Sequence, residues 1–365
     1  MTTVGFDVEA ASGLARVGRV RTARGHFPTP CFMPVGTRGA IRTLETADLE
    51  GLGVEVVLAN TYHLMLRPGV DVLAGFGGLH RFSDWQGHLL TDSGGYQVFS
   101  LGPTVDDDGV SFRSVYDGSI HRLTPEAAVA IQEVIGADIQ MALDVCPALP
   151  AEPATLRLAV ERTAAWAARA RRAHRREGQA IFGIVQGGDD PTLRVESAER
   201  TVALDFDGYG VGGLSVGEPR ERMLPALAAT MAALPADRPR YLMGVGDPVS
   251  VVEAVALGVD MFDCVLPTRL ARHGAALTSA GRVHVRAAAM VADERPVDPE
   301  CCCPVCQRYA RAYLRHLFAV GEPTAARLLT LHNLAWMLGF MARIRGAVVD
   351  QRLDALRREV AAVWP

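Results

Sequence analysis

Three cysteines near the C-terminal end have the spacing of a metal site. Cys301, Cys303 and Cys306 form a C-x-C-x2-C pattern. Three thiolates at this spacing can bind one tetrahedral zinc ion, which then needs a fourth ligand. His316 and His332, both in later helical stretches, are the candidates for that ligand. A closed set of three cysteines and one histidine leaves no open coordination position, so the pattern predicts a structural zinc ion.

Two aspartates form a second candidate site. Asp92 lies in TDSGGYQVFS, after a short apolar run and before a double-glycine turn that lets backbone N–H groups approach a ligand. Asp263 lies in DMFDCVLPTR, where apolar residues shield it on one side. Paired carboxylates suit chemistry at an anomeric carbon, because one can attack or stabilise an oxocarbenium-like centre while the other transfers protons. Both a glycosidase and a glycosyl transferase fit this pattern.

Eight short apolar runs must position these aspartates. Each run is followed by a polar or glycine-rich turn, and helical patterns lie between several of them. Strands alternating with helices predict a parallel (β/α)8 barrel, with a doubly wound open sheet as the alternative. Polar residues follow the runs, and in a barrel they would converge on the face that carries the chemistry. The runs cover residues 31–35, 55–59, 88–90, 138–143, 181–185, 209–213, 241–244 and 259–262.

The pattern changes near residue 293, where a polar, proline-punctuated segment precedes the cysteines. Helices are expected over about 307–318, 324–341 and 347–363. We therefore expect three parts, which are a catalytic barrel, a zinc-binding subdomain and a C-terminal helix that packs back on the barrel. Their ranges are 1–292, 293–345 and 346–365.

Composition narrows the class of protein. Of the 365 residues 49% are hydrophobic, enough for a large core and too many for a disordered chain. No apolar run approaches the ~20 residues of a membrane span, and the first residues lack a signal-peptide pattern. The seven cysteines are odd in number and clustered, which favours a reducing compartment over a disulfide framework. A cytoplasmic protein is therefore expected, without a membrane partner.

The net charge of −4 excludes a protein that coats nucleic acid through a basic surface all over the molecule. All 37 basic residues are arginines. Any anion-binding site must therefore be built from planar guanidinium groups.

Motifs along essentially the whole chain resemble those of the bacterial tRNA-guanine transglycosylases, or queuine tRNA-ribosyltransferases. The resemblance implies a (β/α)8 barrel with a zinc subdomain, one structural Zn2+ per subunit and a homodimer. It also implies a pentosyltransferase of queuosine biosynthesis, which exchanges the wobble guanine of tRNAs with a GUN anticodon for a 7-deazaguanine. In order, the motifs are NTYHLMLRPG (60–69), DSGGYQVFSL (92–101), GIVQGG (183–188), GGLSVGEP (212–219), YLMGVGDP (241–248), DMFDCVLPTR (260–269), DERPVDPEC (293–301) and LHNL (331–334).

The resemblance assigns catalytic and metal-binding roles. Asp263 resembles the nucleophile that attacks the ribose anomeric carbon and forms a covalent tRNA intermediate. Asp92 resembles the general acid/base that serves the leaving and entering bases. The family's zinc ligands match the three cysteines and His332, rather than His316.

Base-binding positions also match. Asp144 and Gln186 resemble the readers of the purine's Watson–Crick edge, and the backbone N–H of Gly213 would donate to the ring carbonyl. Tyr96 and Met243 resemble the two faces of a stacking slot. The whole set implied by the resemblance is Asp92, Ser93, Gly94, Tyr96, Asp144, Gln186, Gly213, Leu214 and Met243.

RNA contacts are expected beside the nucleophile. Arg269 and Arg272 match the family's anticodon-loop contacts. Arg308, Arg311 and Arg315 fall at helical spacing beside the zinc site, where they either follow phosphates or form a solvated face. The remaining positions that resemble RNA-binding residues are Gly244, Val245, Gly246 and Asp247.

Two departures from the family pattern concern the incoming base. Val145 replaces the usual acidic residue, and Ser215 replaces the usual small residue after GGL. Cys146 and Val216 match the bacterial pattern, and Val216 should narrow the space for queuine. The expected base is therefore 7-aminomethyl-7-deazaguanine, bound more weakly than in a relative that carries the acid.

Three alternatives are open. The chain could be a queuine-salvaging enzyme, or a related transglycosylase that acts on another nucleic acid. It could also be a non-catalytic tRNA-binding subunit. Retention of both Asp92 and Asp263 argues against the non-catalytic subunit.

Overall fold

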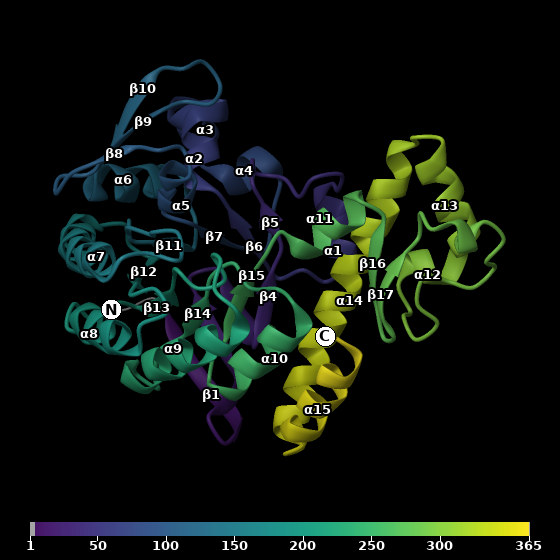
Figure 1. Cartoon of the computed structure of the whole chain (residues 1–365). Coiled ribbons are helices and arrows are strands. Elements are labelled where there is room, and N and C mark those ends of the chain that lie inside the picture. Colours follow the sequence, from purple (N-terminus) through teal and green to yellow (C-terminus); the bar gives the residue numbers. More distant parts are fainter. Residues whose placement is uncertain (1–3, 365) are drawn as a thin grey trace.

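The central element of the computed structural model, which describes residues 4–364, is a closed parallel barrel (Figure 1). Its strand order is β4-β15-β14-β13-β12-β11-β7-β6-β5. The two ends of this order, β4 (Cys31–Met33) and β5 (Val35–Gly36), are one strand interrupted at Pro34, so the sheet closes on itself. The barrel prediction is confirmed and the open sheet is excluded. The other strands are β6 (Val56–Ala59), β7 (His88–Thr91), β11 (Ile139–Met141), β12 (Ala180–Val185), β13 (Gly208–Val211), β14 (Arg240–Leu242) and β15 (Met261–Asp263).

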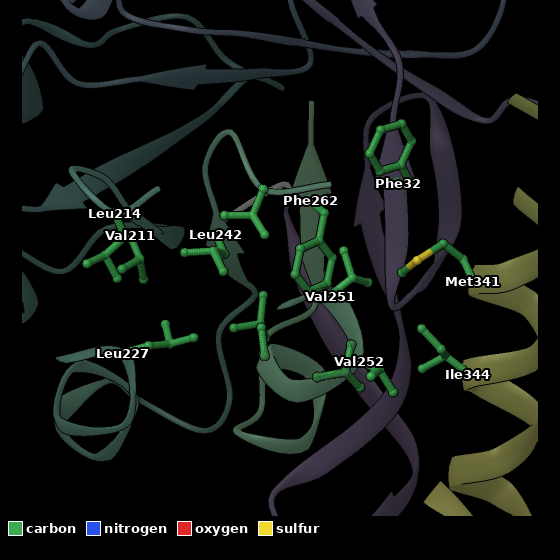
Figure 2. Close-up of a cluster of buried hydrophobic side chains, with 14 of the residues drawn as sticks. Phe32, Val211, Leu214, Leu227, Leu242, Val251, Val252, Phe262, Met341 and Ile344 are labelled. Atoms are coloured by element: carbon green, nitrogen blue, oxygen red, sulfur yellow. The ribbon is translucent and has the colours of Figure 1, made fainter. Parts of the chain in front are cut away.

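Alternate residues of each strand enter two different cores. Met261 of β15 belongs to the cluster inside the barrel, whereas its neighbour Phe262 belongs to the cluster between strands and helices. Figure 2 shows Phe262 near Val251 and Val252 of the helix α10 (Pro248–Ala256). Both faces of the strands are therefore buried, which explains their nearly uninterrupted apolar sequences.

Helices cover the outside of the barrel (Figure 1). Several begin at a proline preceded by a capping side chain, such as Thr124 before α6 (Pro125–Ile135) and Asp190 before α8 (Pro191–Val202). Smaller elements follow β6 and β7 at the mouth. They are α2 (Thr61–Leu64), the π-helix η1 (Met65–Gly69), α3 (Val70–Phe76), α4 (Leu79–Ser83), α5 (Gly95–Phe99) and the strands β8 (Thr104–Val105), β9 (Val110–Arg113) and β10 (Ile120–Leu123). The larger outer helices are α6 (Pro125–Ile135), α7 (Pro153–Ala173), α8 (Pro191–Val202) and α9 (Arg220–Ala233), with α1 (Thr46–Gly51) a shorter one.

An antiparallel sheet that the sequence did not predict precedes the barrel. It consists of β1 (Gly5–Ser12), β2 (Ala15–Thr22) and β3 (Gly25–Thr29). Val20 and Phe27 of this sheet belong to the same apolar cluster as the residues inside the barrel. The sheet therefore contributes apolar side chains to the barrel's interior core.

The C-terminal helices differ from those predicted. The helix expected over 307–318 is two helices, α12 (Pro304–Arg308) and α13 (Arg311–Ala319). The chain is extended between them, because Ala310 forms an antiparallel bridge with Pro296. The helix expected over 324–341 continues to Val349 as α14 (Pro323–Val349), and the last helix, α15 (Leu353–Val363), begins later than expected. This region also contains the 3-10 helix η2 (Ala288–Met290) and a hairpin formed by β16 (Ala275–Thr278) and β17 (Gly281–His284).

The long helix α14 joins the cysteine-containing region to the barrel. Its first half packs beside α12 and α13, and its second half places Met341 and Ile344 in the same cluster as Phe32 of β4 (Figure 2). The division of the chain at residues 293 and 346 stays a prediction, and one continuous helix crosses the second of these positions.

The predicted arginine face beside the zinc site is not formed. Arg308 ends α12 and Arg311 begins α13, so the three arginines do not share one helix. Arg311 is buried, donates to the carbonyls of Pro296 and Val297 and pairs with Asp293. Its guanidinium group holds the local loop together and is not available to a phosphate.

No helix among residues 4–364 is both long and apolar enough to cross a membrane.

A buried ion pair fixes the N-terminal sheet to the strand that carries Asp263. Arg16 of β2 donates to both carboxylate oxygens of Asp260, at 2.9 and 2.6 Å, and the backbone N–H of Arg240 also donates to this carboxylate. Asp260 is fully buried. Removal of one partner would leave an uncompensated charge in the core.

We predict that Arg16→Ala lowers the free energy of unfolding by about 3–5 kcal/mol, because the carboxylate of Asp260 loses its charged partner. Denaturant unfolding followed by circular dichroism measures this change. The matched control is Arg19→Ala, also on β2, whose partner Glu9 is about half exposed; it should change stability by less than ~1 kcal/mol. Equal effects of the two substitutions would contradict the prediction.

Candidate active site

One cavity of about 550 Å3 opens at the carboxyl ends of the barrel strands. It gathers most residues predicted for the site, although they come from six separate segments of the chain. Those that line it are Asp92, Ser93, Tyr96, Asp144, Gln186, Gly213, Leu214, Met243, Gly244, Gly246, Asp247, Asp263 and Arg269. Gly94, Val245 and Arg272 do not line the cavity, and the side chain of Val245 is buried in the core.

Asp92 follows β7 and is held by the segment that follows the neighbouring strand β6. Asn60 Nδ2 donates to one oxygen at 2.5 Å, and the backbone N–H of Thr61 donates to the other at 2.8 Å. Burial raises the pKa of Asp92 to about 6, although these donors oppose the shift and the charge of Asp263 adds to it. Asn60 was expected at the mouth as the polar residue that ends its apolar run, without an assigned role, and Thr61 was not predicted.

Asp263 ends β15 and is held by the segment that follows β14. Tyr241 Oη donates to Oδ1 at 2.5 Å, and the backbone N–H of Gly244 donates to the same oxygen at 2.7 Å. Burial raises the pKa of this carboxyl group above its usual value. The positive φ of 76° at Gly244 is a backbone conformation that favours glycine. Tyr241 begins the motif YLMGVGDP, but no role in the site was expected for it from the sequence.

The two aspartates therefore face one cavity with different environments. A carboxyl group with a pKa near 6 can both donate and accept a proton close to neutral pH. The other carboxylate is oriented by a hydroxyl and an amide and has one oxygen without a described donor. The arrangement suits acid–base chemistry beside a nucleophile or an electrostatic stabiliser.

The floor of the cavity carries a carboxylate next to an amide. Asp144 accepts from Ser93 Oγ at 3.1 Å and from Gln186 Nε2 at 2.6 Å, and burial raises its pKa to about 6. Gln186 Oε1 is buried and has no hydrogen-bond partner among the described residues. Such a surface fits a ligand with several adjacent polar edge groups, since buried polar atoms need partners.

Gly213 is required beside this pair. Its φ is +66°, and a Cβ atom at this position would collide with Gln186 Oε1. The glycine therefore lets the backbone approach the amide side chain closely.

Arg194 of α8 is the main supporting residue that the sequence did not reveal. Its side chain is fully buried and donates to four carbonyl oxygens, on both sides of the cavity floor. Burial without a carboxylate partner lowers its pKa to about 10. The guanidinium group thereby fastens the GIVQGG and GGLSVG segments to each other. The acceptors are the carbonyls of Gly188 at 2.7 Å, Gly212 at 2.7 Å, Val185 at 3.1 Å and Gly213 at 3.1 Å.

The rim of the cavity is more exposed than its floor. Tyr96 of α5 is 61% exposed, which leaves its ring free to contact a ligand at the mouth. Asp247 is engaged, because its carboxylate caps α10 at Ser250 N and pairs with Arg220. Arg269 and Arg272 lie on α11 (Leu266–Arg272), where burial, and after it the positive charges of Arg42 and Arg269, lower the pKa of Arg272.

Cys301, Cys303, Cys306 and His332 converge far from this cavity. Their ligand atoms lie within 4.8 Å of one another. His332 Nε2 lies 2.8 Å from the carbonyl of Leu277, to which its N–H can donate, and this tautomer leaves Nδ1 free for a metal. Nδ1 is 3.6 Å from Cys303 Sγ and 3.2 Å from Cys306 Sγ. A tetrahedral zinc ion would hold such atoms about 3.5 Å apart, so the cluster can bind a metal ion.

Comparison with known proteins gives the same family throughout. The family model described as queuine tRNA-ribosyltransferase matches residues 10–365. A queuine tRNA-ribosyltransferase of Moorella thermoacetica is 53% identical over 350 residues, which cover 95% of this chain and 93% of the relative. One of Desulforamulus reducens is 50% identical over 352 residues, covering 96% and 95%. The chain therefore belongs to the queuine tRNA-ribosyltransferase family of pentosyltransferases.

Proposed function

We propose that the protein exchanges the wobble guanine of tRNAs with a GUN anticodon for a 7-deazaguanine, in queuosine biosynthesis. The single observation that carries the proposal is the pair Asp92, which is buried, and Asp263, which is partly buried, at one cavity, each oriented by donors from the neighbouring strand end. Family membership supports the substrate class.

In the first half-reaction, a carboxylate oxygen of Asp263 attacks C1′ of the target ribose. The bond between C1′ and guanine N9 breaks, its electron pair stays on the base, and guanine takes the proton of Asp92. This step gives a covalent aspartyl-ribosyl RNA and an ionised Asp92. The hydrogen bonds from Tyr241 and Gly244 to Oδ1 leave Oδ2 of Asp263 for the attack.

The second half-reaction reverses the first with another base. Asp92 removes the N9 proton of the incoming 7-deazaguanine, whose nitrogen attacks C1′ and displaces the carboxylate of Asp263. A pKa near 6 allows Asp92 to alternate between the two protonation states without a large energetic cost. Two displacements at C1′ retain the configuration of the ribose.

Asp144 and Gln186 would recognise the purine. The carboxylate can accept from adjacent N–H groups of a guanine-like edge, and the amide and the backbone N–H of Gly213 can donate to the ring carbonyl. Tyr96 and Met243 would contact the two faces of the base. Such a base must leave its stack, which an anticodon loop permits more easily than a duplex does.

We predict that Asp263→Asn reduces base exchange by at least ~10³-fold, because an amide cannot form the ester intermediate. Incorporation of labelled guanine into a GUN-anticodon tRNA measures the rate. Mass spectrometry of the denatured mixture should detect a protein–RNA adduct with the wild type and none with the variant.

The matched control is Asp237→Asn, at a carboxylate that is 76% exposed, and it should retain wild-type exchange. Binding of tRNA by Asp263→Asn should change little. Exchange by Asp263→Asn within tenfold of the wild type would refute the nucleophile. Exchange into a DNA stem-loop but not into tRNA would instead favour the transglycosylase of another nucleic acid.

We further propose that the incoming base is 7-aminomethyl-7-deazaguanine. Cys146, Leu214 and Val216 line the cavity, and the backbone N–H groups of Ser215 and Val216 donate to Glu218. The carbonyl of Leu214 could accept from the aminomethyl ammonium group. Val145 packs against the apolar cluster around Trp166 and is not part of the cavity lining, so its effect on the base would be indirect.

We expect kcat/KM to be higher for 7-aminomethyl-7-deazaguanine than for queuine on one GUN-anticodon tRNA. Val216→Gly should shift this ratio towards queuine by providing space for its cyclopentenediol, whereas Val145→Ala should leave it nearly unchanged. A tenfold preference of the wild type for queuine would identify a salvage enzyme instead.

For the metal we propose zinc, held by the cluster of three cysteines and His332. The thiolate-rich donor set and the oriented histidine nitrogen support this choice. The ion would have a structural role, since it would connect α12 to α14 and lies outside the cavity. A homodimer is also expected from the resemblance to the family.

Metal analysis should find one zinc per chain, and chelation should lower the thermal stability of the C-terminal region before that of the barrel. Cys303→Ser should lose the ion because Cys303 Sγ belongs to the cluster. Cys302→Ser is the matched control, since Cys302 is exposed and outside it. Zinc retained by Cys303→Ser and lost by Cys302→Ser would reverse the assignment.

A further inference from the structure

Two arginines share one tyrosine beside the mouth of the barrel. The guanidinium carbon of Arg67 lies 4.4 Å from the centre of the Tyr116 ring, and that of Arg38 lies 5.4 Å from it. His63 Nδ1 is 3.0 Å from the hydroxyl of Tyr116, and the two rings meet edge to face. We call Arg38, Arg67, Tyr116 and His63 the arginine–tyrosine cluster.

Neither arginine in this cluster is neutralised. Both side chains are exposed. Within residues 4–364 neither guanidinium group forms a hydrogen bond, and neither lies within 4.0 Å of a carboxylate oxygen. Asp117, which follows Tyr116 in the sequence, accepts from Ser119 instead. Within residues 4–364 about half of the other exposed arginines pair with an acid, as Arg122 does with Asp106, so the feature that sets this cluster apart is that two unpaired guanidinium groups lie beside one ring. Two unpaired cations near one ring repel each other, so an anion between them would be stabilised.

The cluster adjoins the reaction centre. His63 lines the same cavity as the two aspartates, and it lies on α2, whose first residue donates its N–H to Asp92. Thr37, one residue before Arg38, also lines the cavity. The arginines therefore flank the position of the target nucleotide without reaching into the base pocket.

Charge is distributed unevenly around the barrel mouth. Arg269, Arg38 and Arg67 follow β15, β5 and β6, which are consecutive positions around the closed sheet. Acidic residues such as Asp189, Glu218 and Asp247 follow β12, β13 and β14. Asp189 pairs with Arg222 and Asp247 with Arg220; those arginines are therefore neutralised, unlike Arg38 and Arg67. A single-stranded polyanion would therefore be attracted to the positive arc that passes over the two catalytic carboxylates.

We propose that Arg38 and Arg67, held against Tyr116, bind backbone phosphates of the RNA substrate that flank the exchanged nucleotide. This inference rests on the proposed function. Stacking on the ring limits the motion of each guanidinium group and leaves its N–H edges free for phosphate oxygens. The RNA backbone would run from α11, with Arg269 and Arg272, across the mouth to this cluster.

Charge favours RNA over a protein partner at this position. Tyr116 lies between β9 and β10, which form an antiparallel hairpin. In this hairpin Val115 and Ile120 are 57% and 68% exposed and could contact a protein. These apolar side chains do not explain two unpaired arginines beside the cavity, whereas phosphate groups do.

The test uses the full-length enzyme with a GUN-anticodon stem-loop RNA and radiolabelled guanine. In Arg38→Ala/Arg67→Ala, KM for RNA should rise by roughly tenfold or more, because two charge-assisted contacts are lost. Both kcat and KM for guanine should stay within about threefold of the wild type, since neither arginine enters the base pocket. In a potassium chloride titration, the slope of log kcat/KM against log salt concentration should become shallower by about 1.4, since each contact to single-stranded RNA contributes about 0.7.

Two further variants separate charge from structure. Tyr116→Phe keeps the ring and should retain most RNA affinity, whereas Tyr116→Ala should reproduce part of the loss. Arg358→Ala is the matched control, because Arg358 is exposed on α15, outside the mouth; it should change neither KM nor the salt slope.

The outcomes distinguish this inference from the proposed function. Absence of exchange in the wild type would overturn the proposed function itself. Wild-type exchange with an unchanged RNA KM and salt slope in Arg38→Ala/Arg67→Ala would overturn the phosphate contact alone, and would leave the surface to a protein partner or to solvent. A raised KM with an unchanged salt slope would also overturn it, because the loss would then not be electrostatic.

Discussion

The active site depends on hydrogen bonds between the ends of neighbouring barrel strands. A buried carboxylate is costly unless donors surround it, and here each carboxylate takes donors from an adjacent strand end. Asp92 after β7 is held by Asn60 and Thr61 after β6, and Asp263 of β15 is held by Tyr241 and Gly244 of the β14 end. Pairing of β6 with β7 and of β14 with β15 is therefore a condition for the chemistry, because it brings these donors to the carboxylates.

The same contacts explain why burial does not abolish the function of these acids. Burial raises the pKa values of Asp92 and Asp144 to about 6, and hydrogen bonds to the ionised forms limit the rise. Both groups therefore remain able to change protonation near neutral pH, which acid–base catalysis requires. Arg194 stabilises the opposite side of the cavity, where its buried charge is distributed over four carbonyl dipoles rather than one carboxylate.

Elements outside the barrel also help to hold these strand ends in place. The N-terminal sheet contributes Arg16, whose partner Asp260 lies three residues before Asp263 on the same segment. On another side, α14 places Met341 and Ile344 against the core near Phe32 and carries His332 to the cysteines (Figure 2). A single helix, α14, thus connects the barrel to the metal-binding region.

Strand positions were predictable because each buried strand leaves a local apolar run. All eight runs coincide with barrel strands, and the Cys301, Cys303 and Cys306 spacing identified a cluster that the structure assembles with His332. Helix ends were less predictable. The break between α12 and α13 depends on a bridge to Pro296, which lies in a different segment, and propensity along one segment cannot report such a contact.

The residues of the site divide in the same way. The sequence by itself determined the chemical groups, the barrel and the family resemblance, since these follow from residue types, periodicity and ordered motifs. Tertiary structure alone decided which groups support the acids and the cavity floor, because Asn60 and Tyr241 donate to the acids, and Arg194 to floor carbonyls, only after folding brings them together. It also decided that Arg311 is a buried structural residue and that Arg38 and Arg67 meet at Tyr116. Whether a charge is satisfied or free is set by its neighbours in space, and those neighbours lie in distant parts of the sequence.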